Sequence, residues 1–202
     1  MHSRWDIMRR KDREITDRER IEDILVGARY LHPGMSDGDF PYVVLLHCGY
    51  RMENGKLTFY VHSANEGHKP ACLRSDNRVF VEIDRGEALI SADVPCKYGA
   101  VYESVMCRGR ALFAEDAAEK CAALSALMKT QTGKAHEIDE KAVDAVTVIR
   151  IDIDTYTAKA CVRKRHNRKY PQKRFKTLLG VLLLVIPTEW LCRLQRPCRW
   201  PW

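Results

Sequence analysis

Asn54-Gly55 is the feature that most constrains how this chain can fold. Both residues tolerate the positive backbone angles of a two-residue hairpin turn, which most other residue pairs do not. A β-branched and aromatic run, Tyr42–Leu46, precedes the pair, and a second run, Leu57–His62, follows it. We therefore predict two antiparallel strands joined by a turn over Glu53–Lys56.

Further extended segments follow at short intervals and are rich in β-branched and aromatic residues. They are Arg78–Ile83, Val101–Cys107, Arg108–Phe113 and Val146–Ile153, with Thr155–Ala160 continuing the last segment or pairing with it. Gly109 stands where a bulge or bend would fall between two of them. About six or seven strands result.

Helices are fewer and short. Thr16–Glu19 has the spacing of a capping box and predicts a helix from about residue 17 to residue 29. Asp116–Glu119 has cap spacing again, and apolar residues on one helical face follow it up to Gly133. A third helix is expected around Lys69–Ser75. Strands at short spacing with occasional helices favour an antiparallel sheet or barrel in an α+β, mostly β protein, and not a doubly wound parallel sheet.

The net charge of +7 is unevenly distributed. From Arg163 to Trp202 eleven Lys and Arg residues face one acid, Glu189, so that residues 1–162 carry a charge of −3. The basic character therefore belongs to the C-terminal tail. It gives no argument for a nucleic-acid-binding domain.

The eight cysteines show neither a CxxC pair nor the Cys/His spacing of a zinc site, so no metal site is predicted. The first 17 residues are charged throughout and do not resemble a signal peptide. We interpret the cysteines as reduced thiols in a cytoplasmic protein.

The tail itself contains a ten-residue, largely apolar run over residues 178–187. This run is too short for a membrane-spanning helix, which needs about 20 residues. Two interpretations remain open. The basic and apolar residues could associate with a membrane surface, or the tail is a poorly ordered extension, which is the interpretation we favour.

The segment Tyr60–Leu73 combines groups that suit a phosphate. A strand-like run ends there in a polar turn with Gly67, and the chain then enters the expected helix. Exposed N–H groups and the positive end of the helix dipole attract an anion, and Lys69 adds a full charge. The segment is predicted to be an anion site, although it has neither a P-loop nor a GxGxxG pattern.

Four segments together resemble the pyridoxamine 5′-phosphate oxidase-like flavoproteins, and within them the nitroimidazole-resistance (Nim-like) branch. The most specific is the block His-Ser-Ala-x-x-Gly-x-Lys over His62–Lys69. The segments are Pro41–Tyr50, Leu57–Lys69, Asn77–Glu82 and Tyr102–Ala111. The resemblance implies a six-stranded antiparallel split β-barrel over residues 16–162, with an N-terminal extension (1–15) and the tail (163–202) outside it.

The resemblance also implies FMN at a homodimer interface and a set of cofactor-binding residues. Ser63, Gly67, His68 and Lys69 match the segment that holds the flavin phosphate in the family. The strand along the flavin ring is matched by Pro41, Tyr42, Val43 and Val44. The strand that completes the pocket, often from the other subunit, is matched by Tyr102 and Ser104.

The function that follows from the resemblance is that of an FMN-dependent oxidoreductase, with a nitroaromatic such as a 5-nitroimidazole as substrate. His62 matches a histidine near the flavin, and its ordinary pKa of about 6.5 would let it exchange a proton with substrate near neutrality. The alternative is a carrier or sensor without turnover that binds flavin or haem, with His62 or His47 as an iron ligand.

Overall fold

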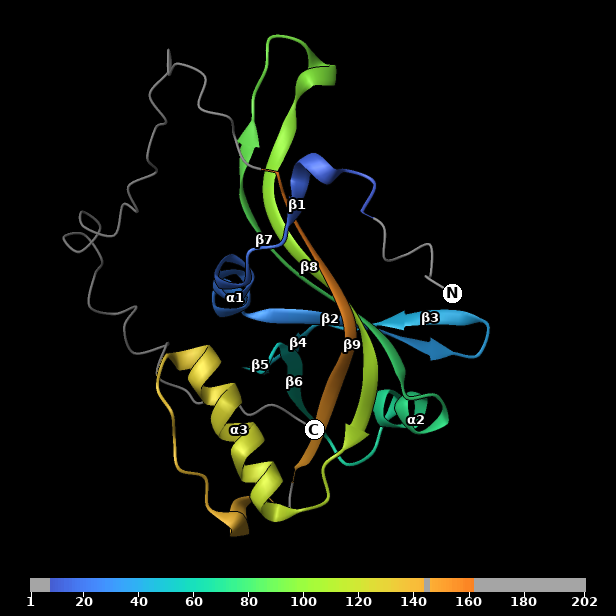
Figure 1. Ribbon diagram of the computed structural model, residues 1–202. Helices are drawn as coiled ribbons and strands as arrows, with labels where there is room; N and C mark the ends of the chain where they lie inside the picture. The colour runs from blue at the N-terminus through green and yellow to red at the C-terminus, as the bar shows by residue number, and fades with distance from the viewer. Residues whose placement is uncertain (1–7, 144–145, 162–202) are drawn as a thin grey trace, which may run out of the picture. The chain divides into compact units, whose positions relative to one another are not determined.

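An antiparallel β-sheet forms the body of the protein in the computed structural model, which describes residues 8–143 and 146–161 (Figure 1). Nine strands contribute to the sheet within these ranges. Their bounds are β1 Glu14–Ile15, β2 Tyr30–Asp37, β3 Phe40–Val43, β4 Leu46–His47, β5 Gly49–Glu53, β6 Lys56–Ser63, β7 Arg78–Ile90, β8 Gly99–Phe113 and β9 Thr147–Cys161. The mostly antiparallel α+β fold that we predicted is thereby confirmed.

The strands are ordered β3-β2-β7-β8-β9-β6-β5, with β1 paired to β9 and β4 paired to β2. The sheet is not closed, because the path ends at β3 on one side and at β5 on the other. β7, β8 and β9 are long and pass through the middle of the structure (Figure 1). Since β1 begins at Glu14, the sheet includes two residues of the expected N-terminal extension.

Within the part of the chain that the structure describes, three α-helices lie against the sheet: α1 Arg18–Gly27, α2 His68–Ser75 and α3 Ala117–Thr132. The cap predicted at Asp116 is present, since its side chain accepts a hydrogen bond from the backbone N–H of Glu119. The first helix is capped one residue later than the Thr16–Glu19 spacing predicted, because the side chain of Asp17 accepts a hydrogen bond from the backbone N–H of Glu19. α3 ends at Gly133, whose φ is +76°. Three short 3₁₀ helices, Lys11–Arg13, Pro95–Lys97 and Glu140–Ala142, complete the described elements.

The side chains that fill the core follow the alternation of the strands. Phe59 and Val61 of β6 point into the main core together with Val81, Val105 and Ile24. A smaller core lies on the other face of β6, where the side chains of Tyr60, Ala114, Ala123 and Val148 meet beneath α3. β6 is therefore covered on both faces, and the segment that follows it is held at a defined place.

The hairpin at Asn54-Gly55 is confirmed, with φ angles of +50° and +80°. Its first strand, however, is Gly49–Glu53 and not Tyr42–Leu46, because Tyr42 pairs instead with Met35 in a separate hairpin of β2 and β3. Gly49 permits this arrangement, since a Cβ atom there would collide with the backbone of Leu127 in α3.

Two segments that were predicted to be separate strands form one continuous strand. Val101–Cys107 and Arg108–Phe113 both belong to β8, and the predicted irregularity at Gly109 is a shift in the pairing of β8 with β9. β9 likewise joins its two expected segments, Val146–Ile153 and Thr155–Ala160, in one strand that begins at Thr147. The sequence did not predict β2. The turn that was expected over residues 35–40 is shorter in the structure, because only Gly38 and Asp39 lie outside the strands.

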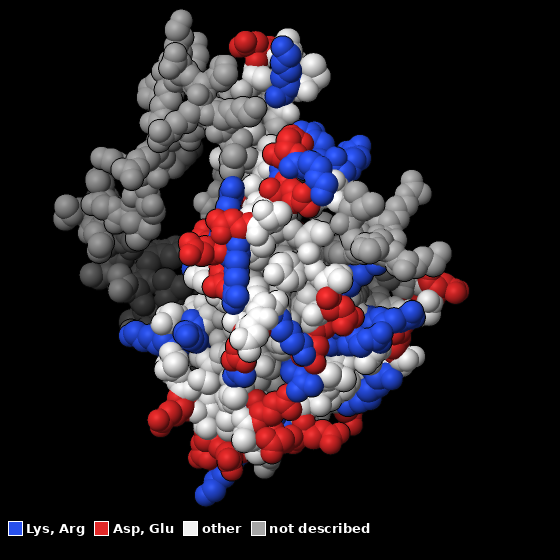
Figure 2. Space-filling model, viewed as in Figure 1, with Lys and Arg blue, Asp and Glu red and all other residues white. Residues whose placement is uncertain are grey.

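The predictions for residues 163–202 lie outside the described residues. In residues 8–143 and 146–161, none of the helices has the length and apolar character needed to cross a bilayer. Basic and acidic side chains are interspersed over the face shown in Figure 2.

Candidate functional site

β6 ends at Ser63, and α2 begins at His68 after a loop of four residues. Gly67 precedes the helix with φ +130°, a backbone angle that favours glycine. It has no side chain to cap the helix, so the first N–H groups of α2 have no side-chain cap. The end of the helix that attracts anions is thus left available.

Asn65 holds the loop in place. Its side-chain oxygen accepts a hydrogen bond from the Thr147 hydroxyl at 2.7 Å, and its carbonyl oxygen accepts one from Arg74 at 3.4 Å. Ser63 pairs with Thr147 through the β6–β9 ladder and is half-buried. The loop is therefore anchored to β9 on one side and to α2 on the other.

Lys69 is the most distinctive charge at this site. Its side chain is half-buried, and it has neither a hydrogen bond nor an ion pair with any residue that the structure describes. Burial lowers the pKa of its ammonium group below the ordinary 10.5. A half-buried cation without a partner costs stability, and an anionic ligand would remove that cost.

His62 lies close to this lysine. Its pKa is lowered from 6.5, first by partial desolvation and then by repulsion from Lys69 and His47. We call His47, His62 and Lys69 the cation cluster. His47 is held by Gln131 of α3, whose side-chain oxygen lies 3.0 Å from Nδ1 and whose amide donates to the backbone oxygens of Arg29 and Cys48.

His68 makes contacts that the sequence could not indicate. Its Nε2 lies 2.8 Å from the carboxylate of Asp37, and its ring meets the ring of Tyr42 edge-on at 4.8 Å between centroids. Asp37 is at the end of β2, in the segment expected to be a turn. The acidic turn residue was visible in the sequence, but nothing there indicated its partner 31 residues later.

In the strand that was predicted to lie along the flavin ring, exposed and half-buried side chains alternate. The side chains of Pro41 and Val43 are exposed, whereas those of Tyr42 and Val44 are half-buried and pack against the core. Tyr42 joins this strand to α2 through its contact with His68. The structure therefore brings β3 next to the start of α2, as a shared site requires.

Tyr102 and Ser104 lie far in space from the other predicted site residues. Ser104 pairs with Lys159 and His62 pairs with Val148, so that the two partners are eleven residues apart along β9. This separation corresponds to roughly 35 Å of extended strand. Ser104 is 4% exposed, and its hydroxyl oxygen has no hydrogen-bond partner among the described residues. Within one chain, these two residues do not join the cation cluster.

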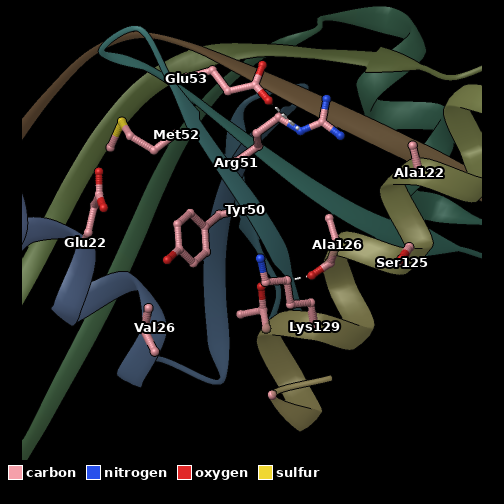
Figure 3. A pocket seen from close by; sticks show the side chains of 12 residues that line it. Glu22, Val26, Tyr50, Arg51, Met52, Glu53, Ala122, Ser125, Ala126 and Lys129 are labelled. Carbon is pink, nitrogen blue, oxygen red and sulfur yellow. Dashed lines mark hydrogen bonds and ion pairs between the residues drawn. The ribbon is translucent and has the colours of Figure 1, made fainter. Parts of the chain in front are cut away.

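Two described cavities lie outside the predicted residues. One, of about 800 Å³, is bounded by α1, β5 and α3, and Tyr50 points into it between Glu22 and Lys129 (Figure 3). Burial and then the charge of Glu22 raise the pKa of the Tyr50 hydroxyl. The other, of about 500 Å³, is lined by residues of β2, β7 and β8, among them Arg78 and Arg110.

The family model for pyridoxamine 5′-phosphate oxidase matches residues 17–160. Among solved structures, a candidate 5-nitroimidazole antibiotic resistance protein from Bacteroides thetaiotaomicron is 34% identical, with a TM-score of 0.63 over 73% of this chain and 86% of that one. None of the curated proteins compared with the chain matches it.

Two more distant structures share the fold. The flavocytochrome Anf3 from Azotobacter vinelandii is 17% identical, with a TM-score of 0.64, and covers 95% of this chain and 96% of its own. An FAD- and haem-binding protein from Mycobacterium smegmatis is 14% identical, with a TM-score of 0.63, and covers 89% of this chain and 96% of its own.

Proposed function

The chain belongs to the pyridoxamine 5′-phosphate oxidase family, and we propose that it is an FMN-dependent oxidoreductase whose cofactor phosphate binds at the start of α2. The observation that carries the proposal is Lys69, a half-buried cation without a partner among the described residues, next to an uncapped helix N-terminus. A phosphate fits both features, because it pairs with the ammonium group and accepts hydrogen bonds from free N–H groups.

Each residue of the site has a role in this proposal. Lys69 and the N–H groups after Gly67 bind the phosphate, and Ser63 donates its hydroxyl to it. Tyr42, Val43 and the backbone around Pro41 form the surface along the flavin ring. The Nε2 atom of His68 is already paired with Asp37, so His68 contributes through the position of α2 and through its contact with Tyr42.

The reaction that we propose is the reduction of a nitroaromatic such as a 5-nitroimidazole. It is supported by the 34% identity to the candidate resistance protein. Bound FMN supplies the electrons, while the protein positions the substrate and handles protons. Because its pKa is lowered, His62 is largely neutral at pH 7 and gains its proton only in more acidic solution.

A second copy of the chain completes the site in this proposal. Phe40, Val43 and Leu45 are large apolar residues with exposures of 76%, 59% and 55%, and they lie in or next to β3, an edge strand of the sheet. Several exposed large apolar side chains at a sheet edge are typical of an interaction site. Since Tyr102 and Ser104 lie far from His62 within one chain, the proposal assigns the strand that completes the pocket to the second copy. Sedimentation should give a dimer, and a stable monomer with full FMN occupancy would contradict it.

A carrier or sensor that binds flavin or haem is the second candidate. It is favoured by the proximity of His47 to His62, since the charge of His47 adds to desolvation and to the charge of Lys69 in lowering the pKa of His62. Absorption of the purified protein separates the candidates, since flavin and haem have different spectra. The six cysteines in the described residues are free thiols. Because free thiols are typical of a reducing compartment, the proposal places the protein in the cytoplasm.

Lys69→Met tests the phosphate site directly. The variant keeps the apolar stem and removes the charge, so FMN affinity should fall roughly 10- to 100-fold, as expected for one charge-assisted hydrogen bond. Riboflavin has no phosphate, and its affinity should not change. Lys56→Met, an exposed lysine at the β5–β6 turn, is the matched control. An equal loss for FMN and riboflavin would show that the assigned role is wrong.

A further inference from the structure

A thiol, an imidazole and a carboxylate meet where β2 ends beside α2. His68 Nε2 lies 2.8 Å from Asp37 Oδ2, and Cys72 Sγ lies 3.7 Å from His68 Nε2 and 3.8 Å from Asp37 Oδ1. The ligand atoms of the three residues all lie within 4.8 Å of one another. These are three of the side-chain types that bind zinc in proteins.

We propose that Asp37, His68 and Cys72 form a zinc-binding site with one open coordination position. Zinc bonds of roughly 2.0–2.3 Å in a tetrahedron place two ligand atoms roughly 3.3–3.6 Å apart. The two distances from sulfur are close to these values. The shorter distance between imidazole and carboxylate is that of a hydrogen bond, which opens when the ion takes the place of the shared proton.

The backbone positions the ligands without need of rearrangement. His68 and Cys72 are four residues apart on α2, so their side chains lie on one face of the helix. Asp37 closes the site from the end of β2, and both of its oxygens face the other two ligands. Ligands on a helix and a strand hold a metal more precisely than ligands on a loop.

The chemistry favours zinc over other common cations. A thiolate is a soft ligand, whereas magnesium and calcium require oxygen ligands. Cys72 is 6% exposed, but the His68 side chain is 55% exposed, so the ion can enter from solvent and a water molecule can fill the fourth position. Binding releases the thiol proton to solvent, and the ring proton of His68 moves from Nε2 to Nδ1, so that the imidazole stays neutral and the two anionic ligands balance the charge of the ion.

Charge balance separates this site from the proposed flavin site. A neutral zinc complex adds no charge beside Lys69, which remains available for a phosphate. The zinc site therefore does not depend on FMN, and its test uses flavin-free protein in phosphate-free buffer.

Cobalt and zinc titrations of the full chain, kept reduced with a phosphine, test the site. We expect one Co²⁺ per chain with a thiolate-to-cobalt charge-transfer band, and its displacement by one Zn²⁺. Cys72→Ala should abolish the band and weaken zinc binding by more than the roughly 10- to 100-fold that loss of an outer-shell partner costs. Cys96→Ala, which removes an exposed thiol from another part of the chain, should change neither result.

Asp37→Asn gives a second test that does not alter a buried residue. It keeps the shape of the side chain and removes its charge, so zinc affinity should fall while circular dichroism shows an unchanged fold. The proposal is overturned if the unmodified chain binds no zinc, if Cys72→Ala retains the charge-transfer band, or if Cys96→Ala loses it to the same extent.

Discussion

The cation cluster at the start of α2 and an ion-pair network that joins α1 to β7 and β8 have their charges balanced in opposite ways. In the network, Arg85 donates hydrogen bonds to Glu103 at 2.8 Å and to the Asp23 carboxylate at 2.5 Å, and Arg20 donates to Glu103 at 3.0 Å. Each cation there has an acidic partner. Lys69 has none among the described residues.

The pKa shifts show the same contrast. Hydrogen bonds from Arg85 and Arg20 outweigh the effect of partial burial and lower the pKa of Glu103, so its charged form is stabilised. In the cation cluster, burial lowers the pKa of Lys69, so its charged form is destabilised. The network has its balancing charges within the chain, whereas the function proposed above has an anionic ligand balance the charge of Lys69.

His62→Gln gives the largest effect that this comparison predicts. If His62 supplies a proton to the substrate, nitroimidazole turnover should fall about 100-fold or more, within the range for a general acid. Flavin occupancy should be unchanged. In the unmodified protein the rate should rise as pH falls below 6.5, because the pKa of His62 is lowered, and in the variant this dependence should disappear.

Steady-state kinetics between pH 5 and pH 8 measure both quantities. His136→Gln, an exposed histidine in the segment after α3, is the matched control and should behave like the unmodified protein. Unchanged turnover in His62→Gln would remove His62 from the mechanism.

Glu103→Gln should lower the free energy of unfolding by about 2 kcal/mol, because it removes the carboxylate that Arg20 and Arg85 share and, among the described residues, leaves only Arg85 with another acidic partner, Asp23. Urea unfolding measures the change. Glu53→Gln removes an exposed ion pair with Arg51 and should cost less than about 1 kcal/mol. Equal losses in the two variants would show that the network does not stabilise the fold more than an ordinary surface pair.

Lys69→Met should have the opposite sign. Removing a half-buried charge that has no partner should leave the free energy of unfolding unchanged or raise it by up to about 1 kcal/mol. The same urea experiment, without FMN, measures it. A clear loss of stability would mean that the fold itself, and not a ligand, balances this charge.

The smallest effect concerns pH. The folded-state pKa of His62 is below its ordinary value of 6.5, so between the two values the unfolded chain binds more protons. The free energy of unfolding should therefore fall as pH falls through 6.5, and His62→Gln should reduce that fall. Urea midpoints for both proteins at matched pH values give the difference. Identical pH dependence in the two would show that His62 is not shifted.

Local signals in the sequence predicted local structure correctly. Asn54-Gly55 forms the predicted turn, Asp116 caps its helix, and Gly109 lies at the predicted irregularity. Each depends on a few neighbouring residues. The partner of Tyr42 was predicted wrongly, because the sequence did not indicate β2, the strand that pairs with Tyr42 across the short turn at Gly38 and Asp39.

In the candidate site, too, some features follow from neighbouring residues in the sequence and others only from the tertiary structure. By itself, the sequence determined the strand, glycine and lysine at the entrance of α2, since these residues are adjacent in the chain. Only the tertiary structure decided that Lys69 is half-buried without a partner among the described residues, that His62 lies near it, and that Asp37 meets His68 and Cys72. Burial and charge proximity arise when distant strands pack together, and no spacing along the chain specifies them.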